Sequence, residues 1–162
     1  MKNKLKQMTG VAAVEGHLLR RRYFNEEVLA HVAERIKKGE AAHTGELMVA
    51  VEAVMPSHEA SPHLRALEVY GRLRVWDTPL NSGVLLYLAL DQQAIEIVAD
   101  RGLSATDAQW QQICTGLQTR FAEADYIDAL LDTIDAIQLL LKEHAPAGDN
   151  SVNVLPNEPV VF

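Results

Sequence analysis

One stretch of the chain decides the fold: Gly83-Val-Leu-Leu-Tyr-Leu-Ala-Leu-Asp-Gln-Gln-Ala-Ile-Glu-Ile-Val-Ala-Asp-Arg-Gly102. Its first half, residues 84–90, is apolar without interruption, which is typical of a strand covered on both faces. Residues 95–99 alternate between two faces instead, which favours a strand nearer the sheet edge. Residues 91–93 are polar and predict a tight turn between the two strands. The stretch therefore predicts a hairpin whose two polar ends return to the same edge of the sheet.

A strand and a crossover helix are expected before this hairpin. The run Glu46–Met55 reads as a strand that is ended by Pro56. Ser61-Pro62 then supplies a helix N-cap and a proline at the first helical position, and this helix runs out near Trp76. Because a helix connects the first strand to the central one, we expect these two strands to be parallel.

Three further helices complete the predicted α/β fold. One has Asn25 as its N-cap, the next opens with a capping box at Thr106, and the last begins at Ile127. The aspartates of the last helix are expected to form a solvated face: Asp128, Asp132 and Asp135.

Length and composition predict one domain with two tails. At 162 residues and 48% apolar, the chain is long enough for one buried core. We assign residues 25–145 to this domain, residues 1–24 to a basic helical segment, and residues 146–162 to a C-terminal tail that is either draped over the domain or disordered. The N-terminal segment reads either as a membrane-surface or partner-docking helix, or as a helix lying loosely on the domain. We favour the second reading because Gly10 and Gly16 interrupt the apolar face.

Charge is unevenly distributed along the chain. Residues 1–38 carry nine Lys and Arg against four Asp and Glu, whereas the remainder carries six against eighteen, for a net charge of −7. An acidic body repels phosphate, so we expect no nucleic-acid partner. We also expect a cytoplasmic protein without a transmembrane span, because no apolar run approaches about 20 residues, no secretory signal is recognisable, and Cys114 is a lone cysteine.

The predicted strand directions gather polar residues at one edge of the sheet. This edge combines the carboxylates of Glu46, Asp77 and Asp100 with the amide of Asn81, and oxygen ligands of this kind suit Ca²⁺ or Mg²⁺. Five more residues at the edge are candidates: Thr44, Ser82, Gly83, Arg101 and Gly102. In the alternative reading, the short polar side chains only cap turns and Asp100 pairs with a surface base.

Other chemistry has weaker support in the sequence. His58, Glu59 and His63 form the only cluster of histidine and acid, but the spacing of the histidines does not place them on one helical face, so we do not expect metal ligation there. Cys114 lies on an apolar stripe and reads as an inert core thiol. No catalytic triad, phosphate-binding loop or dinucleotide fingerprint is recognisable.

Three segments resemble the TPM domain family, in particular a short bacterial form without signal or transmembrane segments. They are Thr44-Gly-Glu-Leu-Met-Val-Ala-Val, Asn81-Ser-Gly-Val-Leu-Leu-Tyr-Leu-Ala and Ile95-Glu-Ile-Val-Ala-Asp-Arg-Gly-Leu103. The resemblance implies a three-layer α/β/α sandwich with a small mixed sheet flanked by helices. It also implies weak acid phosphatase activity, calcium binding, or an accessory role in photosystem repair or with membrane proteins.

The chain departs from the family pattern at both turns of the polar edge. Many members have Lys-Asp-Asn-Gly where this chain has Leu80-Asn81-Ser82-Gly83, and Gly-Tyr-Gly where it has Asp100-Arg101-Gly102. One carboxylate is thus lost and another gained beside a base. Our leading hypothesis is an accessory module that binds a cation or a protein partner at this edge. The alternatives are a weak metal-assisted phosphatase and an adaptor that sits peripherally on the inner membrane face through its N-terminal helix.

Overall fold

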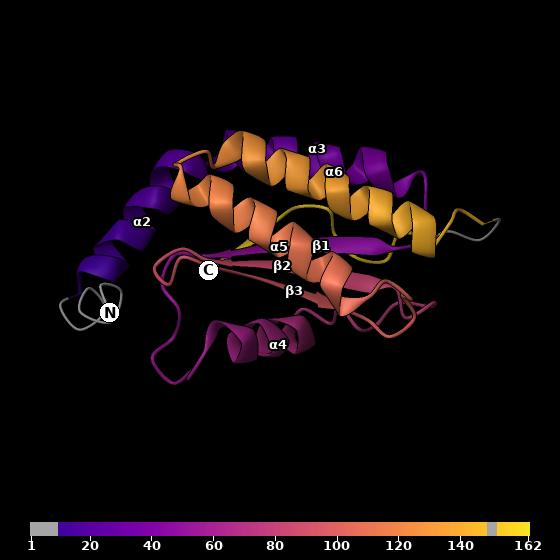
Figure 1. The fold of residues 1–162 in the computed structure, drawn as a ribbon, viewed down its shortest axis with the longest axis horizontal. Coiled ribbons are helices and arrows are strands. Elements are labelled where there is room, and N and C mark those ends of the chain that lie inside the picture. The colour runs from indigo at the N-terminus through magenta and orange to yellow at the C-terminus, as the bar shows by residue number, and fades with distance from the viewer. Residues whose placement is uncertain (1–9, 149–151) are drawn as a thin grey trace.

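A computed structural model describes residues 10–148 and 152–162 (Figure 1). In chain order the helices are α2 (Val11–Tyr23), α3 (Glu26–Glu40), α4 (Pro62–Arg72), α5 (Asp107–Ala122) and α6 (Ile127–His144), and the strands are β1 (Glu46–Glu52), β2 (Gly83–Ala89), β3 (Ala94–Ala99) and β4 (Val160–Val161). The strands form one mixed sheet in the order β3-β2-β1-β4.

The predicted hairpin and the predicted parallel pair are both present. β1 and β2 run parallel, with Glu46 opposite Gly83 at one end and Glu52 opposite Ala89 at the other. β2 and β3 run antiparallel, with Val84 opposite Ala99. Every residue of β2 is buried because strands flank it on both edges and helices cover both faces.

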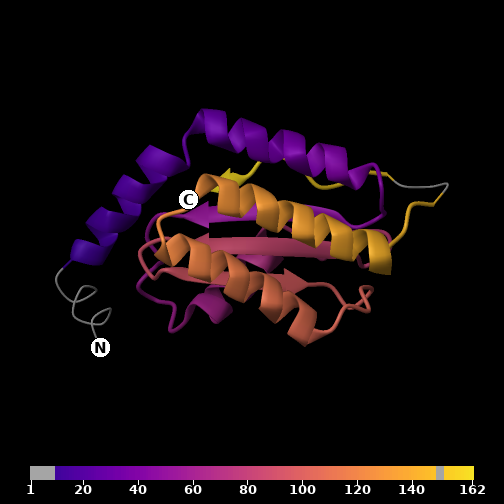
Figure 2. The ribbon, with the colours of Figure 1, turned by 45° about the horizontal axis from the view of Figure 1, so that its top comes forward.

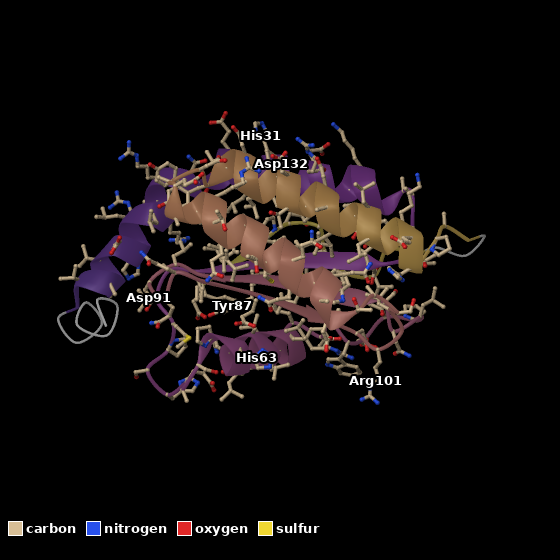
Figure 3. The ribbon with its side chains drawn as sticks, in the orientation of Figure 1. His31, His63, Tyr87, Asp91, Arg101 and Asp132 are labelled. Atoms are coloured by element: carbon tan, nitrogen blue, oxygen red, sulfur yellow. The ribbon has the colours of Figure 1, made fainter. Side chains whose placement is uncertain are left out.

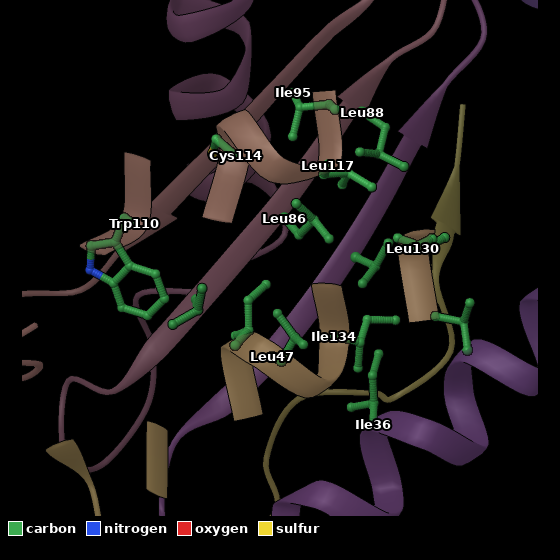
Figure 4. Packing of buried hydrophobic residues seen from close by; sticks show 14 of the residues in the cluster. Ile36, Leu47, Leu86, Leu88, Ile95, Trp110, Cys114, Leu117, Leu130 and Ile134 are labelled. Atoms are coloured by element: carbon green, nitrogen blue, oxygen red, sulfur yellow. The ribbon is translucent and has the colours of Figure 1, made fainter. Parts of the chain in front are cut away.

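Helices cover both faces of the sheet. Figures 1 and 2 show α3, α5 and α6 on one face and α4 on the other. The larger core lies under α3, α5 and α6, where Leu47 and Leu86 of the sheet meet Ile134 of α6 (Figure 4). The smaller core places Met48 and Tyr87 against α4. Successive strand residues thus enter opposite cores, and the α/β/α sandwich is confirmed.

Two element ends differ from the sequence prediction. β1 ends at Glu52 rather than at Met55. α4 ends at Arg72 rather than near Trp76, because Arg74 adopts a left-handed φ of 55° that no α-helix can accommodate.

The C-terminal tail packs on the domain. Val160 and Val161 pair in parallel with Ala50 and Val51 of β1, and Leu155 is buried in the core beneath α4. Of the two readings of this tail, the draped one is therefore correct for residues 152–162. Residues 149–151 lie outside the described part.

The N-terminal helix is present from Val11 onward, and the predicted helical residues before Gly10 lie outside the described part. Gly16 does not simply interrupt an apolar face, because a Cβ there would overlap the carbonyl oxygen of Ala53. α2 therefore contacts the sheet through its backbone. Three apolar side chains of α2 remain exposed: Val11, Val14 and Leu18.

Candidate functional site

Two backbone hydrogen bonds join the turns at the ends of the hairpin. Asp100 N–H donates to the carbonyl oxygen of Gly83 at 2.9 Å, and Gly102 N–H donates to that of Asn81 at 2.9 Å. Asn81 turns the chain with a φ of 50°. We call residues 74–83 and 100–102 the paired-turn corner. The sequence prediction that the two turns share one edge is confirmed.

Close backbone approach fixes this corner. A Cβ on Gly102 would overlap the carbonyl oxygens of Leu80 and Asn81, so only glycine fits the observed geometry. Ser82 N–H donates to Thr78 Oγ1 at 2.9 Å, and Ser82 Oγ donates to the carbonyl oxygen of Thr44 at 3.0 Å. Ser82 therefore ties the corner to the start of β1.

The candidate carboxylates at the corner already have neighbours. Asp77 forms an exposed ion pair with Arg74 at 2.6 Å. Asp100 Oδ1 accepts from the N–H of Arg101 at 2.7 Å, and its buried Oδ2 has no well-formed hydrogen bond. Tyr70 lies beside Asp100, and burial, followed by the charge of Asp100 and a hydrogen bond with it, raises the pKa of Tyr70. Among the described residues, Asp100 thus has no ion pair with a Lys or Arg side chain, in contrast to Asp77, and its side-chain neighbour is the Tyr70 hydroxyl.

Glu46 lies in the same row of the sheet but its carboxylate faces another segment. Its backbone pairs with Gly83, which in turn accepts from Asp100. Its Oε1 accepts from the N–H groups of Val154 and Leu155, the latter at 3.2 Å, whereas its Oε2 has no partner. The backbone of Glu46 therefore lies next to the paired-turn corner, as predicted, but its carboxylate points towards the C-terminal segment.

Only one set of three metal-binding side chains converges among residues 10–148 and 152–162. Atoms of His58, Glu59 and Glu68 lie within 4.8 Å of one another, whereas Glu46, Asp77 and Asp100 form no such set. Glu68 already has a cation partner, since Arg65 Nη1 lies 2.9 Å from its Oε2 and this contact chiefly lowers the pKa of Glu68. His63, which the sequence placed beside His58 and Glu59, pairs instead with Glu96 at 3.2 Å. Glu68 follows His58 by ten residues with a proline between them, and no helical or strand periodicity links such positions. The sequence therefore did not identify Glu68 as a neighbour of His58.

A buried charge network lies at the opposite end of β1. Arg65 donates to both carboxylate oxygens of Glu52, at 2.9 and 2.7 Å, and Tyr87 O–H donates to Glu52 Oε2 at 2.5 Å. Burial and the Glu52 carboxylate raise the pKa of Tyr87. This network holds α4 against the sheet, and Figure 3 shows Tyr87 between them. A glutamate at the end of a buried strand was the sequence signal that could have revealed it.

Large apolar side chains are exposed at the paired-turn corner. Trp76 and Leu80 are 49% and 58% exposed, and the Arg74 guanidinium lies 5.8 Å from the centre of the Trp76 ring. Arg101 is also exposed, and Figure 3 shows it at the opposite end of the sheet from Asp91. Sequence reasoning missed Trp76 and Leu80, because it took the first as the end of a helix.

A cavity of about 560 Å³ extends from this corner along the open edge of β3. Asp100 and Arg101 line one end of it, and Trp110 and Cys114 of α5 line its wall. Burial chiefly raises the pKa of the Cys114 thiol to about 11. The prediction that Cys114 is a core thiol is thus confirmed by its burial.

Comparison with known proteins identifies the family. The family model of the TPM domain matches residues 20–140. The chain belongs to the TPM domain family. Among solved structures, the BA42 protein of the psychrophilic bacterium Bizionia argentinensis matches this TPM domain with a TM-score of 0.76 and 24% identity, over 85% of this chain and 94% of that one.

Two structures of N-terminal domains share the fold at lower similarity. A P. gingivalis domain has a TM-score of 0.60 at 21% identity, covering 76% of this chain and 82% of that one. A Corynebacterium glutamicum domain has a TM-score of 0.57 at 12% identity, covering 80% of each chain. In the described part of this TPM domain, no helix is both long enough and apolar enough to cross a membrane.

Proposed function

We propose that this TPM domain is an accessory module that recognises a protein partner at the paired-turn corner. The observation that carries this proposal is the exposure of Trp76, Leu80 and Arg101 on two turns that the Gly102 to Asn81 hydrogen bond joins. Tryptophan and arginine are enriched among the residues that dominate binding energy at protein interfaces. The Gly102 to Asn81 hydrogen bond holds the backbone beneath them, which lowers the entropy cost of binding.

Site-specific photo-crosslinking in the native host tests this proposal. A benzoylphenylalanine is placed at Trp76 or at Leu80. The matched control is Leu139, which is 69% exposed but belongs to α6 and not to the paired-turn corner. We expect the same discrete adduct from positions 76 and 80 and none from position 139. Identical adducts from all three positions, or no adduct from 76 and 80, would contradict partner recognition at the corner.

A divalent cation, Ca²⁺ or Mg²⁺, is the second candidate ligand of the same edge. Its support is the Asp100 carboxylate, whose buried Oδ2 lies beside the Tyr70 hydroxyl without a cationic partner among the described residues and whose backbone pairs with Gly83 next to the Asn81 turn. Asp77 and Glu46 would have to leave Arg74 and the C-terminal segment to join it. Titration with CaCl₂ should then shift the NMR signals of the Asn81 and Gly102 amides, and Asp100→Asn should abolish these shifts.

A weak metal-assisted phosphatase depends on that cation. The Arg101 guanidinium, next to Asp100, offers a positive charge that could bind phosphoryl oxygens, and both residues line the cavity along β3. Slow hydrolysis of a generic phosphate ester that requires added metal and is lost in Asp100→Asn would favour this activity over partner recognition.

The N-terminal helix supports a further candidate, a cytoplasmic adaptor that sits peripherally on the inner membrane face. Val11, Val14 and Leu18 share one exposed face of α2, and Arg21 and Arg22 follow them. Apolar and basic residues of this kind favour anionic lipid surfaces. Sedimentation with anionic vesicles should be lost in Val14→Ser/Leu18→Ser if this reading is correct.

A further inference from the structure

A small cavity lies under the C-terminal segment, on the far side of β1 from the paired-turn corner. Its volume is about 240 Å³. It lies between the end of α3, the start of β1 and the chain that leads to β4. The residues used below all line it: Lys37, Glu40, His43, Glu46, Asn153 and Asn157. We call it the clamp pocket.

Glu46 brings a buried and incompletely satisfied carboxylate to the clamp pocket. It is only 4% exposed, and its Oε2 has no hydrogen-bond partner. A buried carboxylate oxygen without a partner is costly, because burial removes the water that would otherwise solvate its charge. This oxygen therefore points to a ligand that supplies positive charge or a donor.

Glu40 brings a second carboxylate to the same pocket. Its Oε1 accepts from the N–H of Leu47 at 3.3 Å, and its Oε2 accepts from the side-chain amide of Asn153 at 3.1 Å. Burial chiefly, and then the charge of Glu46, raise the pKa of Glu40 to about 7. Within residues 10–148 and 152–162, no Lys or Arg side chain lies within 4 Å of either carboxylate. Lys37 also lines the pocket but forms no ion pair with Glu40 or Glu46, so neither carboxylate has a protein cation in direct contact in the described part of the chain.

His43 adds an acceptor that the fold does not use. Gln138 donates its amide to the carbonyl oxygen of Ile36 at 3.3 Å, so its Oε1 is left to accept from His43 Nε2. In this tautomer Nδ1 of His43 carries a free lone pair. His43 is 2% exposed, and its Nδ1 has no partner in the structure.

We propose that the clamp pocket binds a partly hydrated Mg²⁺ ion between the carboxylates of Glu40 and Glu46. Mg²⁺ keeps several of its waters and is commonly held by one or two carboxylates, which matches the small number of charged ligands. The cavity has room for the ion and its waters, since each water takes about 30 Å³. The free lone pair of His43 Nδ1 accepts a hydrogen bond from a metal-bound water. At the rim, Asn157 Oδ1 accepts from the side-chain amide of Asn153 at 3.0 Å and so holds Asn153 beside Glu40.

The ion would strengthen the attachment of the C-terminal strand. Glu40 binds Asn153, and Glu46 binds the N–H groups of Val154 and Leu155, so both carboxylates already hold the segment that leads to β4. Neutralising their mutual repulsion keeps this segment on β1. This site shares Glu46 with the cation candidate at the corner, but Glu40, Asn153 and Asn157 belong to the clamp pocket alone.

The test is a titration of chelator-treated, full-length protein with MgCl₂, followed by the NMR signals of backbone amides. We expect saturable shifts of Leu47, Val154 and Leu155, whose N–H groups donate to the two carboxylates. Glu40→Gln should weaken binding at least tenfold, and Asn157→Ala, which removes no buried charge, should weaken it several-fold. Asp100→Asn should leave it unchanged.

Two outcomes overturn the inference. The first is the absence of any shift at Leu47, Val154 and Leu155 in the wild-type protein, a result that needs no variant. The second is a set of shifts confined to Asn81 and Gly102 that Asp100→Asn removes and Glu40→Gln does not. That second result would place the cation at the paired-turn corner and leave the corner's proposed role intact.

Discussion

Gly102 and Asn81 are joined by a backbone hydrogen bond of 2.9 Å between two turns that are distant in sequence. This contact brings the end of β3 back to the start of β2 and makes one surface of two separate loops. Trp76, Leu80 and Arg101 all project from this surface. The proposed partner recognition depends on the rigidity of this junction.

Gly102→Ala should open the corner. Its new Cβ would overlap the carbonyl oxygens of Leu80 and Asn81, so we expect a loss of about 1–3 kcal/mol in the free energy of unfolding, as for other overpacked sites. Urea denaturation measures this loss. The matched control is Gly116→Ala on the exposed face of α5, which meets nothing within 4 Å and should stabilise the protein by up to about 1 kcal/mol. Equal effects of the two variants would contradict a locked corner.

Arg65→Met should strongly destabilise the domain. It leaves the Glu52 carboxylate buried without its bidentate partner, and breaking a buried pair in this way costs about 3–5 kcal/mol. The double variant Glu52→Leu/Arg65→Met leaves no unpaired buried charge and should recover part of that loss in thermal or urea unfolding, although the buried Tyr87 O–H then lacks its acceptor. If the double variant loses as much unfolding free energy as Arg65→Met and Glu52→Leu together, Glu52 and Arg65 are not the coupled pair described above.

Glu40 should make stability depend on pH in metal-free buffer with chelator. Its folded pKa of about 7 exceeds the usual value of 4.5, so its proton stabilises the fold at low pH and this stabilisation is lost as pH rises towards 7. Lys37, His43 and Glu46 are the other titratable groups around this carboxyl. From pH 5 to pH 8, Glu40→Gln should gain up to about 3 kcal/mol relative to wild type in urea unfolding. Glu34→Gln, on the exposed face of the same helix, should show no such gain.

Cys114 should resist alkylation in the native protein. Its pKa of about 11 leaves about 0.1% thiolate at pH 8, and the side chain is buried. Iodoacetamide labelling followed by mass spectrometry should therefore be slow until urea unfolds the protein. The comparison is Thr115→Cys in a Cys114→Ser background, one position along α5 on its exposed face, which should react quickly. Similar native rates at the two positions would refute the assignment of Cys114 as a core thiol.

The sequence predicted the architecture well because its signals were local. The unbroken apolar run of β2, the alternation of β3 and the caps at Asn25, Ser61 and Thr106 each act within a few residues. The strand directions then followed from connectivity alone. This was sufficient to place the turns at Asn81 and Asp100 side by side.

Side-chain contacts between distant segments could not be read in the same way. Glu46 was assigned to the corner because its backbone lies there, but the N–H groups of Val154 and Leu155 draw its carboxylate elsewhere. Asp132 and Asp135 lie on a solvated face as predicted, with side chains 66% and 45% exposed, but their ion pairs with Arg120 at 2.6 Å and Arg35 at 2.7 Å were not predicted. No periodicity links such partners, since each pair joins separate helices.

The most direct test of the central claim uses the partner protein that crosslinking at Trp76 identifies. Isothermal titration calorimetry measures the affinity of this partner for the wild-type domain and for a Trp76→Ala/Leu80→Ser variant. Both side chains are exposed, so the variant should fold as wild type does, and circular dichroism checks this. We predict that binding weakens at least about tenfold, as expected when interface hot spots are removed, and that Leu139→Ser binds like wild type. Unchanged affinity in the corner variant would contradict the account.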